Sequence, residues 1–432
     1  MRPKSLYNWI RTVLAIVIWC SGLAMPLMSL AAEVSHFVAR RTSEETKTSA
    51  GWSAVTGTAG TGTTASTNGW IDNSNFSVGE RYLIIATGYH QTSNNNGRSG
   101  FRVTHGGVAF GESEGTEETD RTGTAYKTPY FWFTVWTAAD EDVEIEYYNE
   151  SASHTARVDD VKLIVLNVED LITNNDLKYS ISTTSGALTT TFASKTSLTW
   201  TPANNGDTWW IMAYTRGDIQ TLTGDAYAAR LNIDGTTFFE QETDGEDTND
   251  SPIYGLGWAQ TLSNASHTID VEIRETVGNQ GWFAAGVFAL RLNSFDTYVI
   301  NTVSGAQSLS AGTGSYNQIS TVTRALGRSG DAIVAGGAVI DDKNGRVTAR
   351  LDVDDTTPVS TEYGGWQPAT TDNTPFTAIG LMNYDARESH SFDLDARETS
   401  NVTPDPDAYD SWIVYFSLEE KMPDRRVIIV DN

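Results

Sequence analysis

Short stretches in which hydrophobic and polar residues alternate recur along the whole chain, whereas stretches with the period of an amphipathic helix are scarce. In ARLNIDGT, which begins at residue 229, Leu231 and Ile233 fall on one side of an extended chain, and Arg230, Asn232 and Asp234 fall on the other. A strand with one apolar face buries that face against a second sheet. The pattern therefore predicts an all-β protein built from two-sheet sandwiches.

Three landmarks recur in the same order and divide the chain into repeats. Each repeat has a Gly-acid pair followed by an apolar run, then an alternating stretch that ends in a turn, and then a proline that opens a further strand. The landmarks begin at Gly79, Gly100 and Pro129 in the first repeat, at Gly206, Ala229 and Pro252 in the second, and at Gly330, Ala349 and Pro375 in the third. Each repeat has the strand content of one sandwich.

The repeats predict three tandem β-sandwich domains with a jelly-roll-like strand pattern, at residues 33–170, 171–295 and 296–422. A C-terminal tail at residues 423–432 follows, and its β-prone run VIIV can pair with an open sheet edge. Three such domains make either a rod or a compact trefoil, and the sequence does not choose between them.

The N-terminus has the features of a secretory signal peptide. Arg2, Lys4 and Arg11 are basic, the run VLAIVIW is apolar, and MSLAA ends in small residues. We therefore predict a signal peptide at residues 1–32 and a secreted protein that is extracellular or at the cell surface, with the periplasm as an alternative. Cys20, the single cysteine, falls within this leader, so we expect no disulfide in the mature chain.

The chain is strongly acidic, with 55 acidic against 29 basic residues and a formal net charge of −26. Such a surface repels nucleic acid and anionic membranes, and it suits divalent cations or basic partners. After the leader, no apolar run approaches the ~20 residues that span a bilayer. We expect no nucleic-acid partner and no transmembrane segment after signal cleavage.

A further repeated stretch contains a histidine. SNASHTIDVEIRET from Ser263 returns as RESHSFDLDARETS from Arg387, and in both copies we predict a turn that feeds a strand. The first repeat has AADEDVEIEYYN at this place, without a preceding Ser-His. We interpret His267 and His390 as turn residues and not as metal ligands, because a histidine without a nearby partner makes a poor metal site.

The quoted stretches also resemble a known family. An apolar strand after Gly-Asp, an ARLxIDG strand and turn, and SHTIDVEIRE before a last apolar strand resemble the jelly-roll modules of tumour-necrosis-factor-like and complement-head-like domains, including those of bacterial surface and phage-type fibre proteins. The resemblance covers the strand pattern of most of each repeat. It implies jelly rolls that often form trimers and that bind or scaffold, with no catalytic residues to carry over.

Motifs of common enzymes are absent from the sequence. There is no His-Glu-x-x-His metal helix, no Gly-x-Ser-x-Gly nucleophile elbow and no Gly-rich phosphate loop. Three similar repeats favour binding or assembly over one active site. We therefore predict a non-enzymatic binding or structural subunit of a cell-surface or extracellular assembly, whose partners are glycans, other surface proteins or copies of itself in a homotrimer. A glycan-active hydrolase or lyase stays as an alternative, because a glycosidase needs only two suitably spaced carboxylates.

Acidic loops suggest calcium as the one candidate cofactor, since calcium takes carboxylate and carbonyl oxygens at short spacing. None of these loops matches the ordered EF-hand pattern, and the alternative is a solvated loop that maintains solubility. The candidate calcium ligands are Asp244, Glu246, Asp247, Asp250, Asp341, Asp342, Asp405 and Asp407.

Aromatic residues beside glycines suggest a carbohydrate-binding protein as a second alternative. Trp282 in GNQGWFAAG and Trp366 in EYGGWQPA can expose their rings for stacking, with Gln280 and Gln367 available for sugar hydroxyls. Tyr409 is a third candidate ring. The alternative interpretation is that these rings cap the sandwich cores or pack between domains.

Overall fold

The computed structural model describes residues 34–418 except for the internal segments 94–96, 120–127, 219–224, 246–252, 276–280, 310–315, 326–329, 342–345, 355–356, 359–362, 367–372, 385–388 and 399–406. The predicted signal peptide and C-terminal tail lie outside the described residues. Strands dominate the described chain, and its α-helix α2 (Glu169–Thr173) has only five residues, which confirms the all-β prediction. In this part of the chain, no helix combines the length and apolar character needed to cross a membrane.

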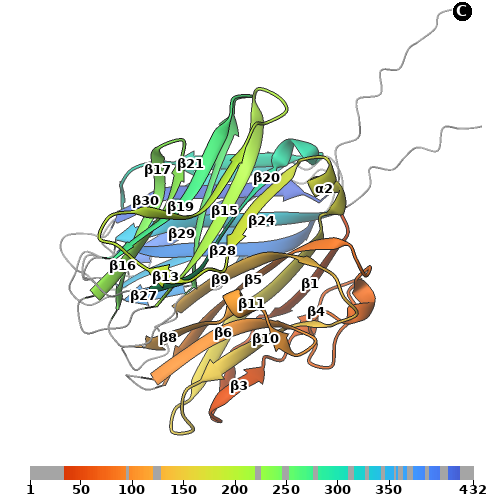
Figure 1. The fold of residues 1–432 in the computed structure, drawn as a ribbon, viewed down its shortest axis with the longest axis vertical. Coiled ribbons are helices and arrows are strands. Elements are labelled where there is room, and N and C mark those ends of the chain that lie inside the picture. The colour runs from red at the N-terminus through yellow and green to blue at the C-terminus, as the bar shows by residue number, and fades with distance from the viewer. Residues whose placement is uncertain are drawn as a thin grey trace, which may run out of the picture.

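The strands form six antiparallel sheets, and successive pairs of sheets make three sandwiches (Figure 1). In each sandwich, the sheet that faces the other two sandwiches is called the inner sheet and the other the outer sheet. If the eight main strands of a sandwich are counted in chain order, the inner sheet has the order 1-8-3-6 and the outer sheet 2-7-4-5. This is the jelly-roll arrangement, and it repeats in all three sandwiches.

The first sandwich contains β1 to β11. Its inner sheet has the order β4-β1-β11-β5-β9 with β2 beside β11, and its outer sheet has the order β3-β10-β6-β7 with β8 beside β6. The bounds are β1 (His36–Arg41), β2 (Glu45–Lys47), β3 (Gly51–Ala54), β4 (Thr58–Ala59), β5 (Arg81–Thr92), β6 (Gly97–His105), β7 (Val108–Ala109), β8 (Gly115–Thr119), β9 (Thr128–Thr137), β10 (Val143–Asn149) and β11 (Ala156–Asn167), with the 3-10 turns η1 (Asn73–Asn75) and η2 (Gly111–Ser113).

The second sandwich contains β12 to β20. Its inner sheet has the order β12-β20-β15-β18 with β13 beside β20, and its outer sheet has the order β14-β19-β16-β17. The bounds are β12 (Leu177–Ser182), β13 (Gly186–Ala187), β14 (Ala193–Trp200), β15 (Asp207–Asp218), β16 (Asp225–Ile233), β17 (Thr236–Gly245), β18 (Ile253–Leu262), β19 (His267–Glu275) and β20 (Gly281–Arg291), followed by the 3-10 turn η3 (Leu292–Ser294).

The third sandwich contains β21 to β30. Its inner sheet has the order β21-β30-β24-β28 with β22 beside β30, and its outer sheet has the order β23-β29-β25-β26 with β27 beside β25. The bounds are β21 (Tyr298–Val303), β22 (Gln307–Ser308), β23 (Asn317–Ala325), β24 (Gly330–Asp341), β25 (Arg346–Val353), β26 (Thr357–Pro358), β27 (Tyr363–Trp366), β28 (Asn373–Tyr384), β29 (Ser389–Glu398) and β30 (Asp407–Ser417).

Inner and outer strands differ in how they are buried, and the difference follows from their position. On the outer strand β19, Ile269, Val271 and Ile273 are fully buried while the residues between them are partly exposed, as the alternation predicts. The inner strand β5 is buried along nearly its whole length. The central strands of an inner sheet are covered on both faces, by their own sandwich and by its neighbours, so they carry continuous apolar runs, whereas the inner-sheet strands β12 and β21 stay partly exposed.

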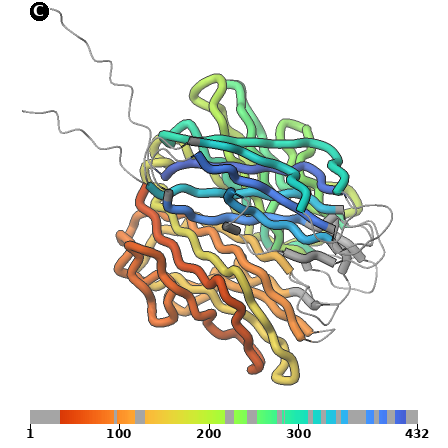
Figure 2. The backbone as a smooth tube through the Cα atoms, turned by 180° about the vertical axis from the view of Figure 1, so that it is seen from behind, coloured from red at the N-terminus to blue at the C-terminus, as the bar shows by residue number. Residues whose placement is uncertain are grey.

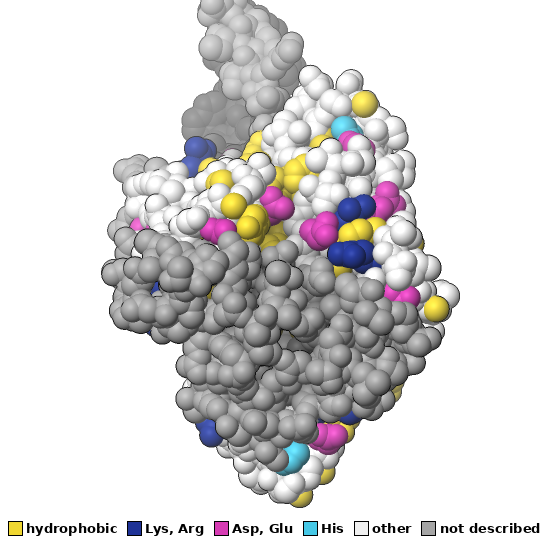
Figure 3. Space-filling view, turned by 90° about the vertical axis from the view of Figure 1, so that its left-hand side faces the viewer, with side chains coloured by type: hydrophobic (Ala, Val, Ile, Leu, Met, Phe, Trp, Pro, Cys, Tyr) yellow, Lys and Arg dark blue, Asp and Glu magenta, His cyan; other side chains and the backbone are white. Residues whose placement is uncertain are grey.

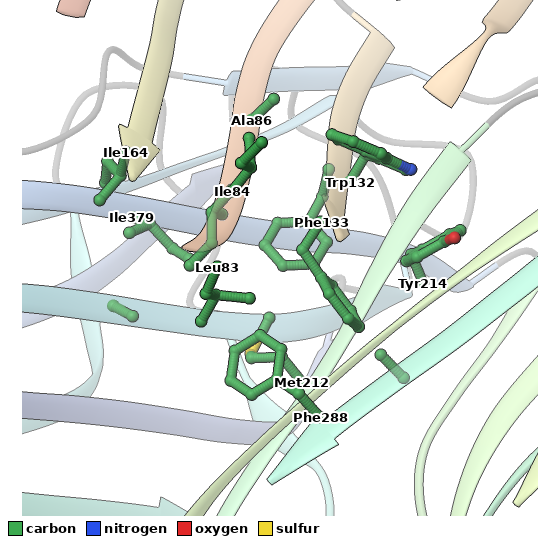
Figure 4. Close-up of a cluster of buried hydrophobic side chains, with 14 of the residues drawn as sticks. Leu83, Ile84, Ala86, Trp132, Phe133, Ile164, Met212, Tyr214, Phe288 and Ile379 are labelled. Atoms are coloured by element: carbon green, nitrogen blue, oxygen red, sulfur yellow. The ribbon is translucent and has the colours of Figure 1, made fainter. Parts of the chain in front are cut away.

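The three inner sheets pack against one another and make one shared core, in which strands β9, β18 and β28 contact each other. Phe133 of the first sandwich lies with its ring centroid 5.1 Å from that of Tyr214 and 4.8 Å from that of Phe288, both of the second sandwich (Figure 4). The ring centroid of Trp210 in the second sandwich lies 5.6 Å from that of Phe416 in the third. The three sandwiches therefore form a compact trefoil and not a rod.

Two glycines of β18 allow the close approach at this core. Gly255 faces the ring of Phe131, and a Cβ atom there would come within 2.7 Å of that ring. Gly257 faces Trp412 in the same way, and a Cβ atom there would overlap the indole. A side chain at either position would push the inner sheets apart, so glycine is required where the backbone of β18 approaches these rings.

The two ends of the described chain lie together. The backbone N–H of Val34 donates to the carbonyl oxygen of Leu418 over 2.8 Å, and the N–H of Leu418 donates to the carbonyl oxygen of Asp331, also over 2.8 Å. Figure 2 shows the first sandwich, red to yellow, beside the third, cyan to blue. The start of the first sandwich is therefore tied to the third.

Candidate functional site

A cleft lies between the first and third sandwiches, where β1 and β11 face β24, β28 and the end of β25. Its volume is about 530 Å³, which is in the range of pockets that hold small molecules. One wall comes from β1, β11 and the turn at residues 60–63, and the other comes from the third sandwich. The cleft is therefore formed by segments far apart in the sequence.

The first-sandwich wall follows from strand geometry. His36, Val38 and Arg40 are two residues apart on β1, so their side chains share one face. The antiparallel pairing of β1 with β11 places Ile164 opposite Val38 and Lys162 opposite Arg40. All five side chains line the cleft. Two basic residues therefore stand directly opposite each other on this wall.

The two basic residues differ in their surroundings. The Lys162 ammonium is 2.8 Å from the Asp160 carboxylate, and the two side chains are 9% and 5% exposed. Asp160 sits at an irregularity of β11 with a φ of 47°, a conformation that is uncommon for a non-glycine residue. Arg40 is exposed and forms no ion pair within the described part of the chain. Arg40 thus brings a positive charge to the cleft that Asp160 does not neutralise.

The two sandwiches meet across the cleft through His36 and Asp331. The Nε2 atom of His36 is 2.8 Å from Oδ2 of Asp331, and its Nδ1 atom is 3.1 Å from the carbonyl oxygen of Val34. Both partners accept hydrogen bonds, so the two ring nitrogens donate together only in the imidazolium form. Asn383 donates to Oδ1 of Asp331 over 2.9 Å. Asp331 is therefore held by His36 of the first sandwich and Asn383 of the third.

The rest of the cleft is apolar. Val38 and Ile164 face it from the first sandwich, and Val353, Leu381 and Met382 face it from the third. A site with an apolar floor and a few fixed polar groups is typical of small-molecule binding.

The other two sandwiches carry different residues at the corresponding positions. In each sandwich a six-residue first strand pairs with the last strand from its first residue onward, which aligns β1 with β12 and β21. The counterparts of His36, Val38 and Arg40 are Leu177, Tyr179 and Ile181 in the second sandwich and Tyr298, Ile300 and Thr302 in the third; the counterparts of Lys162 are Gly286 and Trp412. The basic residues are therefore specific to the cleft between the first and third sandwiches.

The two repeated histidines lie at the starts of strands, His267 as the first residue of β19 and His390 as the second residue of β29, and each has a carboxylate partner that sequence reasoning missed. Nδ1 of His267 is 2.5 Å from Asp234, and Nδ1 of His390 is 2.7 Å from Asp354. The other oxygen of each carboxylate accepts the backbone N–H of the residue after the histidine, Thr268 of β19 or Ser391 of β29, over 2.8 Å. In the second and third repeats, the sequence signal for this pairing was the Asp that ends the ARLxxD stretch together with the Ser-His further along the chain.

The first sandwich has the same kind of pair with the roles exchanged. His105 ends β6, and its Nδ1 atom lies 2.5 Å from Glu141, just before β10. In the second and third sandwiches the acid follows β16 or β25, and the histidine lies at the start of β19 or β29. In each outer sheet, a histidine and a carboxylate therefore pair at one end of two neighbouring strands; the first repeat has no Ser-His at this place, and His105 takes the role from the other strand of the pair.

Arginine and aromatic side chains stack on the outer sheets. The guanidinium of Arg102 lies 4.6 Å from the Trp52 ring, and those of Arg230 and Arg274 lie 4.0 and 4.9 Å from the Phe192 ring. The third sandwich repeats this with Arg350 and Arg397, at 3.8 and 4.7 Å from the ring of Tyr316. Figure 3 shows an arrangement of this kind, with basic groups around a hydrophobic one and acids beside them. These stacks cover the polar faces of the outer sheets.

The predicted sugar-stacking residues do not come together. Trp282 is only 7% exposed and packs beside Gly186, with the Lys195 ammonium 5.4 Å from its ring, so it lacks the open face that stacking requires. Tyr409 is half-buried against the core and its hydroxyl donates to Asp407 over 3.3 Å. Trp366 ends β27, and its side chain, like Gln280 and Gln367, lies outside the described residues.

Most of the predicted calcium ligands lie outside the described residues. Glu246, Asp247, Asp250, Asp342 and Asp405 do so entirely, and Asp244 and Asp341 are described only as strand positions of β17 and β24. Asp407 is 9% exposed and accepts from Ser308 over 2.7 Å. Among the described residues, no three acidic, histidine or cysteine side chains are placed to hold a metal. Calcium binding at the acidic loops stays a prediction.

The third outer sheet holds a buried group of carboxylates that sequence reasoning did not identify. Asp352, Asp393 and Asp395 are 1%, 0% and 3% exposed. Arg350 lies 2.8 Å from Asp352 and 3.1 Å from Asp395. Burial raises the pKa of Asp352 to about 7, the negative charge of Asp395 adds to the rise, and Arg350 opposes it. The second sandwich has Asn232 at the position of Asp352.

Comparisons with family models and curated proteins show no family for this chain. No family model and no curated protein matches it. Among solved structures, PNGF-II is 8% identical, with 80% of this chain and 99% of PNGF-II covered and a TM-score of 0.27. The atomic structure of Sulfolobus Turreted Icosahedral Virus matches with 11% identity, 79% and 82% coverage and a TM-score of 0.19.

A tandem CBM22-1-CBM22-2 domain of Paenibacillus barcinonensis Xyn10C matches with 13% identity, over 56% of this chain and 93% of that one, at a TM-score of 0.19. Similarities at this level carry no functional argument. The jelly-roll assignment rests on the strand order of the three sandwiches.

Proposed function

We propose that this chain is an exported, non-enzymatic binding protein whose ligand site is the cleft between the first and third sandwiches. The observation that carries the proposal is the cleft itself, which combines an apolar floor with Arg40, Lys162 and the His36–Asp331 pair. The shared core of three inner sheets supports a rigid site, because its two walls belong to sandwiches that cannot move apart without exposing that core.

The arrangement of acids in the cleft supports binding over glycan hydrolysis. A glycosidase uses two carboxyl groups that flank the scissile bond. Within the described part of the chain, Asp331 is the one acidic residue that lines the cleft, and it is held by His36 and Asn383. A hydrolase or lyase would need a second carboxylate facing the same space.

The test is a ligand-induced thermal shift with a panel of neutral and acidic monosaccharides and small carboxylic acids. Thr61 is exposed and lines the cleft, so Thr61→Trp is expected to fill it without disturbing a sandwich core. Thr46 is also exposed but does not line the cleft, so Thr46→Trp is the matched control.

We expect at least one panel member to raise the melting temperature of the wild type and of Thr46→Trp, because a ligand that binds only the native state stabilises it. The shift should disappear in Thr61→Trp. A panel that shifts neither protein, or that shifts Thr61→Trp as much as the wild type, contradicts the assignment of the cleft as the ligand site.

A further inference from the structure

The charge of the cleft runs against the charge of the rest of the protein. The chain has a formal net charge of −26, yet three basic residues, His36, Arg40 and Lys162, line this one cleft. Asp160 neutralises Lys162, and Asp331 pairs with His36. The exposed guanidinium of Arg40 is left beside these two pairs. A positive site on a negative protein favours an anionic ligand, since the surrounding charge would otherwise repel it.

The internal repeat shows that these residues are not needed to build an inner sheet. At the positions of Arg40 and Lys162, the second sandwich has Ile181 and Gly286. Lys162 stands directly opposite Arg40 in the strand pairing, and like charges directly opposite each other destabilise a sheet. The buried pair with Asp160 accounts for Lys162, but no ion pair among the described residues accounts for Arg40 opposite it, whereas a ligand carboxylate that pairs with Arg40 would.

The remaining polar groups of the cleft suit hydroxyl groups. Asp331 offers carboxylate oxygens as acceptors, and Asn383, beside it, carries both a donor and an acceptor. The Thr63 hydroxyl oxygen accepts the backbone N–H of Val38 over 3.3 Å, which leaves its own O–H to donate. Acidic and amide side chains on one wall thus face a guanidinium on the other.

The apolar floor lies between these two polar ends. Ile164 and Val38 form it on the first-sandwich side, and Leu381 and Met382 form it on the other. A ligand that fits all three parts has a carboxylate at one end, hydroxyl groups at the other, and an apolar ring face between them. A neutral sugar lacks the first feature, and an aliphatic acid lacks the second.

We propose that the cleft binds an acidic sugar of the uronate type, with its carboxylate on Arg40, its hydroxyls toward Asp331 and Asn383, and the C–H face of its ring on the apolar floor. This proposal rests on the proposed function, since it names the ligand class of the same site. Arg40 acts as the residue that selects the acid, and the apolar floor and hydroxyl partners position the ring.

The experiment is calorimetric titration of the chain without the predicted signal peptide, with D-glucuronate, D-glucose and hexanoate. D-glucuronate has all three features, D-glucose lacks the carboxylate, and hexanoate lacks the hydroxyl groups. The variants are Arg40→Gln in the cleft and, as a matched control, Arg157→Gln. Arg157 is a basic residue of the same sandwich that pairs with Glu44 at 3.0 Å and does not line the cleft.

We expect D-glucuronate to bind at least tenfold more tightly than either D-glucose or hexanoate. Arg40→Gln should weaken D-glucuronate binding by tenfold or more and leave D-glucose unchanged, because it removes one charge-assisted hydrogen-bond partner of the carboxylate. Arg157→Gln should bind like the wild type.

Three results would overturn this proposal alone, and a fourth would also refute the proposed function. Equal binding of D-glucuronate and D-glucose, with both lost in Thr61→Trp, would keep the cleft as a ligand site but remove the selection for acid. If hexanoate binds as tightly as D-glucuronate, the ligand need not be a sugar. If Arg40→Gln binds D-glucuronate with unchanged affinity, Arg40 does not bind the carboxylate. Failure of every compound, including the wider thermal-shift panel, would refute the proposed function together with this inference.

Discussion

Replacing Asp352 with asparagine should stabilise the protein at neutral and alkaline pH. Asp352 is 1% exposed and shares its site with Asp393, Asp395 and Arg350. Asn232, at the same position of the second sandwich, shows that this fold accepts an amide there. An amide keeps the shape of the side chain and removes one buried negative charge.

The magnitude follows from the pKa of this carboxyl. Burial, together with the charge of Asp395, raises it from 3.8 to about 7. A raised pKa in the folded state means that the native protein holds this proton more tightly than the unfolded chain does, so the stability it provides is complete below about pH 4 and is lost as the pH rises through 7. The shift corresponds to at most about 4 kcal/mol, and we expect about 2 kcal/mol because solvent and Arg350 screen the carboxylates.

The assay is urea denaturation of the wild type and Asp352→Asn at pH 4.5 and pH 8, followed by tryptophan fluorescence. The difference in free energy of unfolding between the variant and the wild type should grow in favour of the variant by about 2 kcal/mol between these values and stay constant above pH 8. The reciprocal change, Asn232→Asp, should introduce the same kind of pH dependence into the second sandwich. A difference that does not change with pH would refute the account of this carboxylate group.

Three further predictions concern the shared core, the turns and the state of association. Gly257→Ala should destabilise the protein by about 1–3 kcal/mol in urea denaturation, because its methyl group overlaps Trp412, whereas Gly111→Ala, which meets open space, should change little; equal effects would contradict the close approach. Although partial burial acts to raise the pKa of Asp354, hydrogen bonds from His390 and the Ser391 N–H lower it, so Asp354 stabilises the fold above its unfolded pKa and loses this effect on acidification. His390→Gln should therefore move the acid-unfolding midpoint to higher pH, and an unchanged midpoint would count against the pair. Light scattering should give the mass of one chain, because the three inner sheets already cover one another; a stable trimer would restore the homotrimer that the sequence suggested.

The fold was largely predictable because strands leave a strong local pattern. The alternation around Leu231 and Ile233 correctly predicted a strand with one buried face, and the predicted apolar run after Gly79 is an inner strand that is covered on both faces. The choice between rod and trefoil was not predictable. It depends on contacts such as Phe133 with Phe288, between residues that no local pattern connects.

The candidate site was less predictable than the fold, for a physical reason. Arg40, Lys162 and Asp331 come from three strands in two sandwiches, and each of them looks like an ordinary charged surface residue in the sequence. The features that did stand out locally were poor guides. Trp282 lies in the glycine-containing stretch GNQGWFAAG, but β13 pairs with its strand at this point, Gly186 lies beside the indole, and the residue is only 7% exposed.

The most direct test of the account is a crystal structure of the chain without the predicted signal peptide, with D-glucuronate at a concentration well above the dissociation constant from calorimetry. The account predicts one sugar between the first and third sandwiches, with its carboxylate within hydrogen-bond distance of Arg40 and a hydroxyl near Asp331. A sugar bound on another surface, or an empty cleft under saturating conditions, would contradict it.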